Sequence, residues 1–175
     1  MTEEFLNQLK HNKREAQQEF YNSYSVQMFR LVYRYVDNEQ DAGDIVNTGF
    51  YKIFRNINRF IYRNEISLNV WMKKIIINEA LVFLRQKFTY HEIEDIPSEM
   101  LFSEDITDDN LMLEDYYRLI RELPHDLRTV FNLFAIEGYS HKEIAELLNI
   151  REASSRVYLS RARKILQEKL TNKTK

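Results

Sequence analysis

The sequence has no cysteine, and its 175 residues include only three glycines and two prolines. The absence of cysteine excludes a disulfide framework and a thiolate metal site, and the four histidines are too scattered to form a metal-ligand motif. Few glycines and prolines leave few positions for tight hairpins. Because the apolar residues also recur with the 3.6-residue period of a helix, the sequence predicts an all-α fold.

Long hydrophobic runs are also missing. No stretch of about 18 apolar residues is present, and the N-terminal residues lack the apolar core of a signal peptide. We therefore expect a cytoplasmic protein that does not insert into a membrane. The sequence contains no phosphate-binding loop, no zinc pattern and no pair of acids spaced as in an active site. Neither an enzymatic activity nor a cofactor is expected.

The charge is unevenly distributed along the chain. The formal net charge is −2, which would be unusual for a nucleic-acid-binding protein with evenly spread charge. However, residues 13–87 hold twelve Lys/Arg against eight Asp/Glu, residues 91–115 hold ten acids and no Lys/Arg, and residues 151–175 hold eight Lys/Arg against two Glu. Two basic blocks therefore flank an acidic one.

The most informative stretch, residues 138–166, is typical of a helix-turn-helix, a motif that reads DNA. Its first helix has one apolar face, formed by Ile144, Ala145 and Leu148. In the turn, Asn149 can take the left-handed conformation at low cost, and Ile150 supplies an apolar plug. The second helix is expected to begin at Glu152, whose charge suits a helix N-terminus.

This second helix is expected to have an apolar inner face and a basic outer face. The inner face consists of Leu159, Ala162, Ile165 and Leu166. The outer face is expected to show Arg156, Arg161, Arg163 and Lys164, with Tyr158 and Ser160 among them. Long cations reach phosphates and guanine edges in the major groove, so this face is a candidate DNA reader. The alternative is a solvated, charged face on a terminal helix.

Three longer helices are expected in the N-terminal half, over residues 16–36, 42–60 and 67–88, with a short helix around residues 5–9 before them. Ser67 is the expected N-cap of the third helix. Its inward candidates are Val70, Trp71, Ile75, Asn78, Leu81 and Phe88. Trp71 is interpreted as a core anchor, with base contact as the alternative. Residues 60–69 break the periodicity and predict a loop.

Residues 90–110 combine a proline, poor periodicity and most of the acid excess, which indicates a linker. Two helical stretches follow, residues 111–122 and 126–136, separated by Leu123 and Pro124. The sequence thus predicts two small helical domains, residues 1–89 and 111–175, joined by the acidic linker. The C-terminal domain ends in the helix-turn-helix.

This order of elements resembles the small RNA polymerase sigma factors of the extracytoplasmic-function (ECF) class, in the sigma-70 family. LPHDLRTVFNLFAIEGYSHKEIAELLNI (residues 123–150) and YLSRARKIL (158–166) resemble that family's domain for the promoter −35 element. DAGDIVNTGFYKIF (41–54) resembles its polymerase-clasping helix. VWMKKIIINEALVFLRQK (70–87) resembles its helix that melts and reads the −10 element.

The resemblance implies a protein that binds the β′ and β subunits of core RNA polymerase and gives the polymerase promoter specificity. It also implies that an anti-sigma factor binds this protein. It implies −35 contacts by Ser154, Arg156, Tyr158 and Arg161. It implies polymerase contacts by Asp41, Asp44, Asn47, Thr48 and Lys52. The acids of the linker would either mimic RNA in a basic polymerase channel or keep a tether extended.

For the single-stranded −10 element, the resemblance implies the loop after Arg59. There Tyr62 can stack on a base, Arg63 can hold a phosphate and Asn64 can read a flipped base. Further candidates for the melted strand are Lys74, Asn78 and Arg85. The alternative is that residues 60–69 are simply a polar loop.

The chain departs from the family pattern at several positions. The family usually has an acid at Gly43 and at Val82, and a Gln-Glu pair at Asn47 and Thr48. In the second helix of the motif, Ser155 stands at an apolar position and Val157 at a polar one. Two alternatives stay open: a stand-alone helix-turn-helix regulator that binds duplex DNA without polymerase, and a sigma-like interaction protein that no longer binds polymerase.

Overall fold

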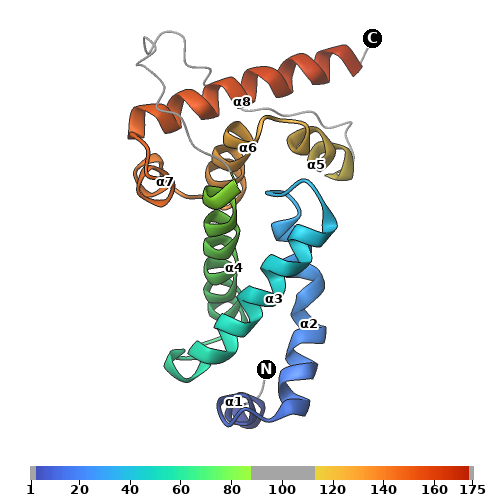
Figure 1. Ribbon diagram of the computed structural model, residues 1–175, viewed down its shortest axis with the longest axis vertical. Helices are drawn as coiled ribbons and strands as arrows, with labels where there is room; N and C mark the ends of the chain where they lie inside the picture. Colours follow the sequence, from blue (N-terminus) through green and yellow to red (C-terminus); the bar gives the residue numbers. More distant parts are fainter. Residues whose placement is uncertain (1–2, 88–112, 174–175) are drawn as a thin grey trace. The chain divides into compact units, whose positions relative to one another are not determined.

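The computed structural model describes residues 3–87 and 113–173, which form helices and their connecting turns (Figure 1). No strand occurs in these two ranges, and the predicted all-α fold is confirmed. The chain divides into two compact units, residues 1–84 and 85–175. The expected acidic linker, residues 90–110, lies outside the described residues.

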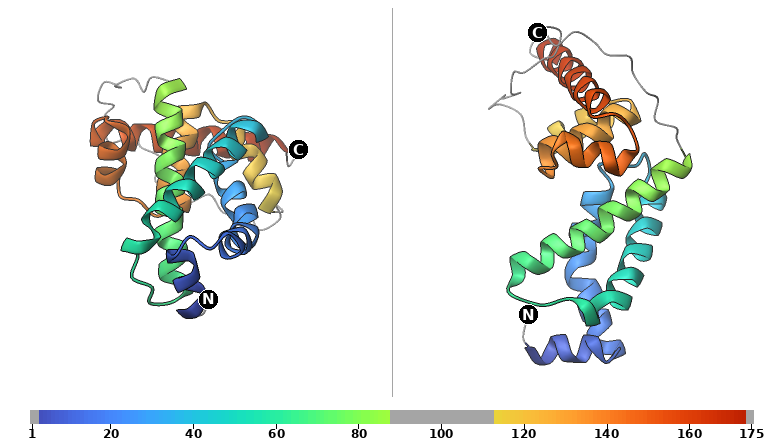
Figure 2. Two further views of the ribbon diagram at one scale, coloured as in Figure 1. Left: turned by 60° about the horizontal axis from the view of Figure 1, so that its bottom comes forward. Right: turned by 90° about the vertical axis from the view of Figure 1, so that its left-hand side faces the viewer.

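Unit 1 contains α1 (Glu3–Lys10), α2 (Arg14–Val32), α3 (Glu39–Asn56), the short 3-10 helix η1 (Ile57–Arg59) and α4 (Glu65–Lys87), whose last turn passes the division. Figures 1 and 2 show α2 and α3 side by side, and the two helices pack on each other. The expected short N-terminal helix is present as α1. The α2 helix ends at Val32 rather than at residue 36.

Aromatic side chains fill the contact between α2 and α3. Phe20 is fully buried, and its ring centroid lies 4.8 Å from that of Tyr24, 6.3 Å from that of Phe50 and 5.9 Å from that of Phe54. Each fully buried Phe contributes about 1.5–3 kcal/mol through the area it removes from water. The predicted inner stripe of α3 is confirmed by the buried residues Ala42, Ile45, Val46, Phe50 and Ile53.

Gly49 lets α4 approach α3 closely. A Cβ atom at this position would lie 2.3 Å from Cδ1 and 3.7 Å from Cα of Ile76. Any larger residue would therefore force the fully buried Ile76 side chain to move.

The α4 helix begins earlier than predicted. It starts at Glu65 because Asn64, and not Ser67, precedes its first turn as the cap. Asn64 Oδ1 accepts the Ser67 N–H at 2.8 Å, and Ser67 Oγ accepts the Asn64 N–H at 3.2 Å. The two side chains cap each other's backbone, as in a capping box.

The inner face of α4 also differs from its prediction. Val70 is 61% exposed instead of buried, Trp71, Ile75 and Asn78 are half-buried, and Phe88 lies outside the described residues. Because apolar residues lie on most sides of this helix, their spacing did not fix which side faces inward. The buried apolar residues are Leu68, Met72, Ile76, Ile77, Ala80, Leu81 and Leu84.

Unit 2 contains α5 (Leu113–Arg121), α6 (His125–Phe131), the π-helical turn η3 (Asn132–Ile136), α7 (His141–Leu148) and α8 (Glu152–Lys173). The long α8 packs against α5, α6 and α7 (Figure 1). Buried Arg128 of α6 donates to the Arg121 carbonyl at 2.7 Å, which places a cation at the negative end of α5. Gly138, with a φ of 78°, follows the η3 segment and turns the chain toward α7.

Within the described residues, no helix is long and apolar enough to cross a membrane. In the same part of the chain, no three His, Asp or Glu side chains gather as a metal site requires.

Candidate nucleic-acid interface

The helix-turn-helix is formed by α7, its turn and α8. Asn149 has a φ of 54° and a ψ of 51°, and the Ile150 N–H donates to the Ala145 carbonyl at 3.1 Å. The left-handed turn, the burial of Ile150 and the start of α8 are all as predicted. Ser140 and Glu143 form a reciprocal capping box at the start of α7, which is a further local signal in the sequence.

The basic face of α8 is narrower than the sequence suggested. Its exposed cations include Arg156, Arg161 and Lys164. In contrast, Ser154, Tyr158 and Ser160 are only 0%, 2% and 8% exposed, so the expected place of Tyr158 and Ser160 on the outer face is wrong, and Ser154 is buried with them. The physical reason is that α8 contacts three other helices, which bury a broad sector of its surface rather than one stripe.

The two exposed arginines predicted to contact the −35 element differ in their partners. Arg156 Nη2 lies 2.5 Å from Oε1 of Glu152, one turn earlier on α8. Within the described part of the chain, Arg161 forms no such pair. An exposed pair one turn apart contributes only about 0.3–0.5 kcal/mol, so a phosphate or a guanine edge can replace Glu152. Both side chains are exposed, and the pair with Glu152 holds Arg156 only weakly.

His141 connects the start of α7 to α8. Its ring stacks on Phe134 at a centroid distance of 4.4 Å, and its Nδ1 lies 2.9 Å from Oγ of the buried Ser155. Burial, followed by the positive charge of Arg156, lowers the pKa of His141. The imidazole is therefore neutral at pH 7 and joins the two helices of the motif in that form.

This lowered pKa predicts an acid-sensitive stability. The unfolded chain, in which His141 titrates near pH 6.5, binds the proton more readily than the folded chain. The contribution of His141 is thus fully present above about pH 6.5 and is lost as the pH falls through the lowered pKa. Thermal unfolding of wild type and His141→Gln at about pH 7.5 and about pH 5.5 measures this. The variant should lose less stability on acidification, and equal losses would contradict the assignment.

In unit 1, the residues around the loop of 60–64 combine exposed cations with stacked rings. Arg59 and Arg63 are exposed, and the half-buried Tyr62 has its ring edge-on to Phe60 at 6.5 Å. Phe60 also stacks on Trp71 at 4.5 Å, which favours the interpretation of this tryptophan as a structural anchor. Asn64, the last residue of the loop, was expected to read a base. Its side-chain oxygen instead accepts the Ser67 N–H in the cap of α4.

Three further strand-binding candidates lie along α4. Lys74 and Arg85 are exposed, and Asn78 is half-buried. Their spacing of i, i+4 and i+11 places them on one side of the helix.

Exposed apolar residues near the start of α4 were not expected from the sequence. Ile61, Ile66 and Val70 are 78%, 74% and 61% exposed. A nearly continuous apolar pattern gives no signal that separates such exposed residues from the core.

On α3, most of the expected polymerase contacts already have partners within unit 1. Asp41 Oδ2 accepts from Asn38 at 3.0 Å, and Asn47 Oδ1 accepts from the Tyr21 hydroxyl at 2.9 Å. Thr48 and Lys52 are also engaged, with Thr48 Oγ1 2.9 Å from the Asp44 carbonyl and Lys52 Nζ 2.6 Å from Glu79 Oε1.

Asp44 differs from these residues in its side-chain contacts. It is exposed, and no cation of the described ranges pairs with it. Spacings of i+4, i+7 and i+11 place it on one side of α3 with Thr48, Tyr51 and Arg55. Tyr51, which was not singled out from the sequence, is 61% exposed, and the Arg55 guanidinium lies 5.7 Å from its ring centroid. This side of α3 combines an acid, an aromatic ring and a cation.

The Lys52–Glu79 pair predicts a stability effect. Glu79 is only 9% exposed, so Lys52→Met leaves a largely buried carboxylate without its cation. We expect the free energy of unfolding, measured by urea denaturation, to fall by about 1–3 kcal/mol. Arg55→Met is the matched control and should change it by less than about 0.5 kcal/mol. Equal stabilities of the two variants would rule out a structural role for Lys52.

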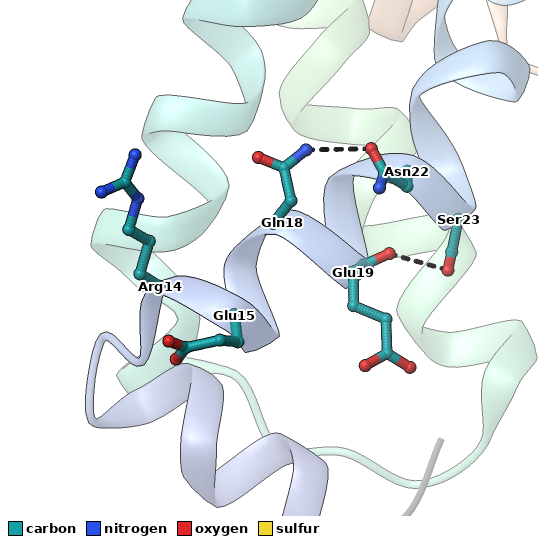
Figure 3. Close-up of a pocket in the computed structure, with 6 residues that line it drawn as sticks. All are labelled: Arg14, Glu15, Gln18, Glu19, Asn22 and Ser23. Atoms are coloured by element: carbon teal, nitrogen blue, oxygen red, sulfur yellow. Dashed lines mark hydrogen bonds between the residues drawn. The ribbon is translucent and has the colours of Figure 1, made fainter.

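Figure 3 shows a shallow depression on α2 lined by polar residues, with hydrogen bonds from Gln18 to Asn22 and from Ser23 to the Glu19 carbonyl. None of the candidate residues contributes to it. Because its lining comes from one helix and is open to solvent, the depression offers no enclosed ligand site.

Comparison with known proteins identifies the family. The sigma-70 region 2 model matches residues 20–88, and the sigma-70 region 4 model matches residues 113–166. The ECF RNA polymerase sigma-E factor of Haemophilus influenzae is 30% identical over 153 residues, which cover 80% of this chain and 79% of that protein. The chain belongs to the ECF class of RNA polymerase sigma factors.

Other matches agree with this assignment. RNA polymerase sigma factor SigV of Bacillus subtilis is 29% identical over 143 residues, which cover 82% of this chain and 84% of that protein. For the fold alone, the sigma factor RpoE of Bartonella quintana, solved in complex with the anti-sigma factor NepR, matches with a TM-score of 0.52 and 20% identity over 88% of this chain and 98% of that one.

The resemblance seen in the sequence is thus confirmed. As an ECF sigma factor, the protein binds core RNA polymerase and directs transcription initiation at promoters. Sigma factors are initiation factors and not enzymes. Neither alternative, the stand-alone regulator or the interaction protein without polymerase, is favoured.

Proposed function

We propose that the two units of this sigma factor have different roles. Unit 2 reads the −35 element, and unit 1 binds polymerase and the single-stranded −10 element. The proposed domain limits are residues 1–89 and 111–175, with the acidic linker between them. The observation that carries this proposal is the exposed basic edge of α8, which the capped α7 and the left-handed turn at Asn149 hold in place.

At the −35 element, Arg156 and Arg161 are the proposed base readers. A guanidinium group donates two hydrogen bonds to guanine O6 and N7, and each good pair contributes about 1–3 kcal/mol of discrimination. Lys164 is the proposed phosphate contact, because it is exposed on the same helix and a lysine ammonium acts as a point charge. The buried Ser154 and Tyr158 are proposed to support this surface from inside rather than to touch DNA.

At the −10 element, the proposed site is the loop of residues 60–64 together with one side of α4. Tyr62 offers a ring for base stacking, and Arg63 offers a charge for the backbone phosphate. Lys74 and Arg85 continue the positive charge along α4. Exposed cations beside an aromatic ring are the combination that single-stranded nucleic acid requires.

Polymerase binding is assigned to the side of α3 that carries Asp44, Tyr51 and Arg55, and we propose the β′ and β subunits of core polymerase as its partners. The linker acids are proposed to occupy a basic nucleic-acid channel of the polymerase. Because the Bartonella quintana sigma factor was solved with an anti-sigma factor, an anti-sigma factor is a proposed partner here too. We place the protein in the cytoplasm, where it acts without catalysis of its own.

In vitro transcription tests this assignment of the two units. Core polymerase and the full-length protein are incubated with promoter templates randomised separately at the −35 and −10 elements, and the transcripts are sequenced. We expect selection at both elements, with Arg161→Ala changing the selected −35 bases and leaving the −10 selection unchanged. The proposal would be contradicted if the wild-type transcripts showed no base selection at either element. It would also be contradicted if Arg161→Ala changed the selected −10 bases instead of the −35 bases.

A further inference from the structure

The carboxylate of Glu65 lies next to the proposed −10 site, which binds a negatively charged strand. Glu65 is the first residue of α4, comes directly after the loop of residues 60–64 and is exposed. Beside a bound phosphate backbone, an isolated carboxylate would weaken binding by repulsion. An acid in the first turn also interacts favourably with the positive N-terminal end of the helix, so the charge of Glu65 alone does not define its role.

One contact of the Glu65 carboxylate reaches α2. The hydroxyl of Tyr24, on α2, donates a hydrogen bond to Glu65 Oε1. The Tyr24 ring is anchored by Phe20, whose centroid lies 4.8 Å away in the core of unit 1. Burial, followed by the neighbouring Glu65 carboxylate, raises the pKa of Tyr24, so the hydroxyl stays protonated and remains a donor. The bond joins two residues 41 positions apart in the chain.

Both ends of the loop are held in place. At its end, the Asn64–Ser67 cap closes the first turn of α4, and Asn69 Nδ2 donates to the Glu65 carbonyl at 3.0 Å. At its start, Phe60 is 8% exposed and stacks on Trp71 at 4.5 Å. Residues 61–63 lie between these two anchors, and the Tyr24–Glu65 bond ties the second anchor to α2.

We propose that Tyr24 and Glu65 are positioning residues for the −10 strand: their hydrogen bond holds the start of α4 against α2 and so keeps residues 61–63 in the shape that receives single-stranded DNA. This inference rests on the proposed function of the loop. A loop that is already ordered loses less conformational entropy when it binds, and this raises affinity without any additional contact.

Charge and positioning predict opposite signs for one substitution. If Glu65 acts only through its charge, Glu65→Ala removes a repulsion and tightens binding of the strand. If Glu65 positions the loop, the same substitution weakens binding, and Tyr24→Phe weakens it equally although no charge changes. Glu65→Gln keeps an oxygen that accepts from the Tyr24 hydroxyl and should therefore retain affinity.

The experiment uses holoenzyme assembled with saturating core polymerase and a fluorescent single-stranded oligonucleotide that carries the selected −10 sequence. We expect Tyr24→Phe and Glu65→Ala each to lower affinity about three- to tenfold, as loss of one hydrogen bond predicts. The double variant should be no weaker than either single one. Glu65→Gln should stay within about twofold of wild type. Affinity for the −35 duplex should not change in any of them.

Tyr21→Phe is the matched control. It removes the same hydroxyl from the same helix, but the Tyr21 hydroxyl donates to Asn47 of α3, 2.9 Å away, and not to α4. It should leave −10 binding unchanged. Tighter binding by Glu65→Ala, wild-type binding by Tyr24→Phe, or an equal loss in Tyr21→Phe would overturn the inference while leaving the proposed loop function intact. A wild-type holoenzyme that does not distinguish the −10 oligonucleotide from a scrambled one would overturn both.

Discussion

Asp44→Lys is expected to lower the affinity for core RNA polymerase by at least about 100-fold, because like charges brought together at an interface cost several kcal/mol. Asp44 is exposed on α3 and has no cation partner among the described residues. Co-elution with core polymerase in size-exclusion chromatography, and titration with labelled protein, measure the effect. Transcription from a cognate promoter should fall with it.

Glu19→Lys provides the matched control for this prediction. It makes a similar charge change at an exposed position of α2, outside the proposed polymerase surface, and should leave core binding within about twofold of wild type. Both variants should keep the helical circular dichroism of wild type, because both positions are exposed and lie within helices. Normal co-elution of Asp44→Lys would show that polymerase binds elsewhere on the protein.

Arg156→Ala and Arg161→Ala are each expected to lower promoter affinity about 5- to 150-fold, but only on templates that carry the preferred base at one −35 position. Loss of a bidentate guanine contact removes discrimination at that position and leaves the others unchanged. Competition binding of holoenzyme to a panel of −35 sequences, each with one base pair changed, measures the pattern.

Two further variants make the result for these arginines specific. Lys164→Ala should weaken binding to all −35 sequences alike and reduce the salt dependence, as loss of a phosphate contact predicts. Glu152→Ala removes the partner of Arg156 and should leave the base preferences unchanged, because the guanidinium group remains. A uniform loss on every sequence in Arg156→Ala or Arg161→Ala would make that arginine a phosphate contact instead.

The helix-turn-helix could be predicted from the sequence because its determinants are local. Asn149 in the left-handed conformation, the plug at Ile150 and the N-terminal acid at Glu152 lie close together in the chain, and each has a backbone or burial consequence that does not depend on distant residues. The inner stripe of α3 was equally predictable, since its apolar residues form a single, well-separated stripe.

The exposure of individual site residues could not be predicted, because it depends on which helices meet. Tyr158 is buried because α8 lies against three helices at once, and Val70 is exposed because α4 meets α3 on the side where Ile76 approaches Gly49. The pairing of Lys52 with Glu79 joins residues 27 positions apart, a separation at which sequence spacing carries no signal. Only the structure therefore shows which of the expected polymerase contacts lack a partner within unit 1.

The decisive experiment is assembly with core polymerase. Full-length wild-type protein is passed through a size-exclusion column with and without core polymerase, and each fraction is tested for binding to a promoter duplex at moderate salt. We expect co-elution with core polymerase and sequence-specific binding of the duplex only by the assembled complex. A protein that never co-elutes with core polymerase, yet shifts duplex DNA alone, would instead be a stand-alone regulator and would contradict the assignment as a sigma factor.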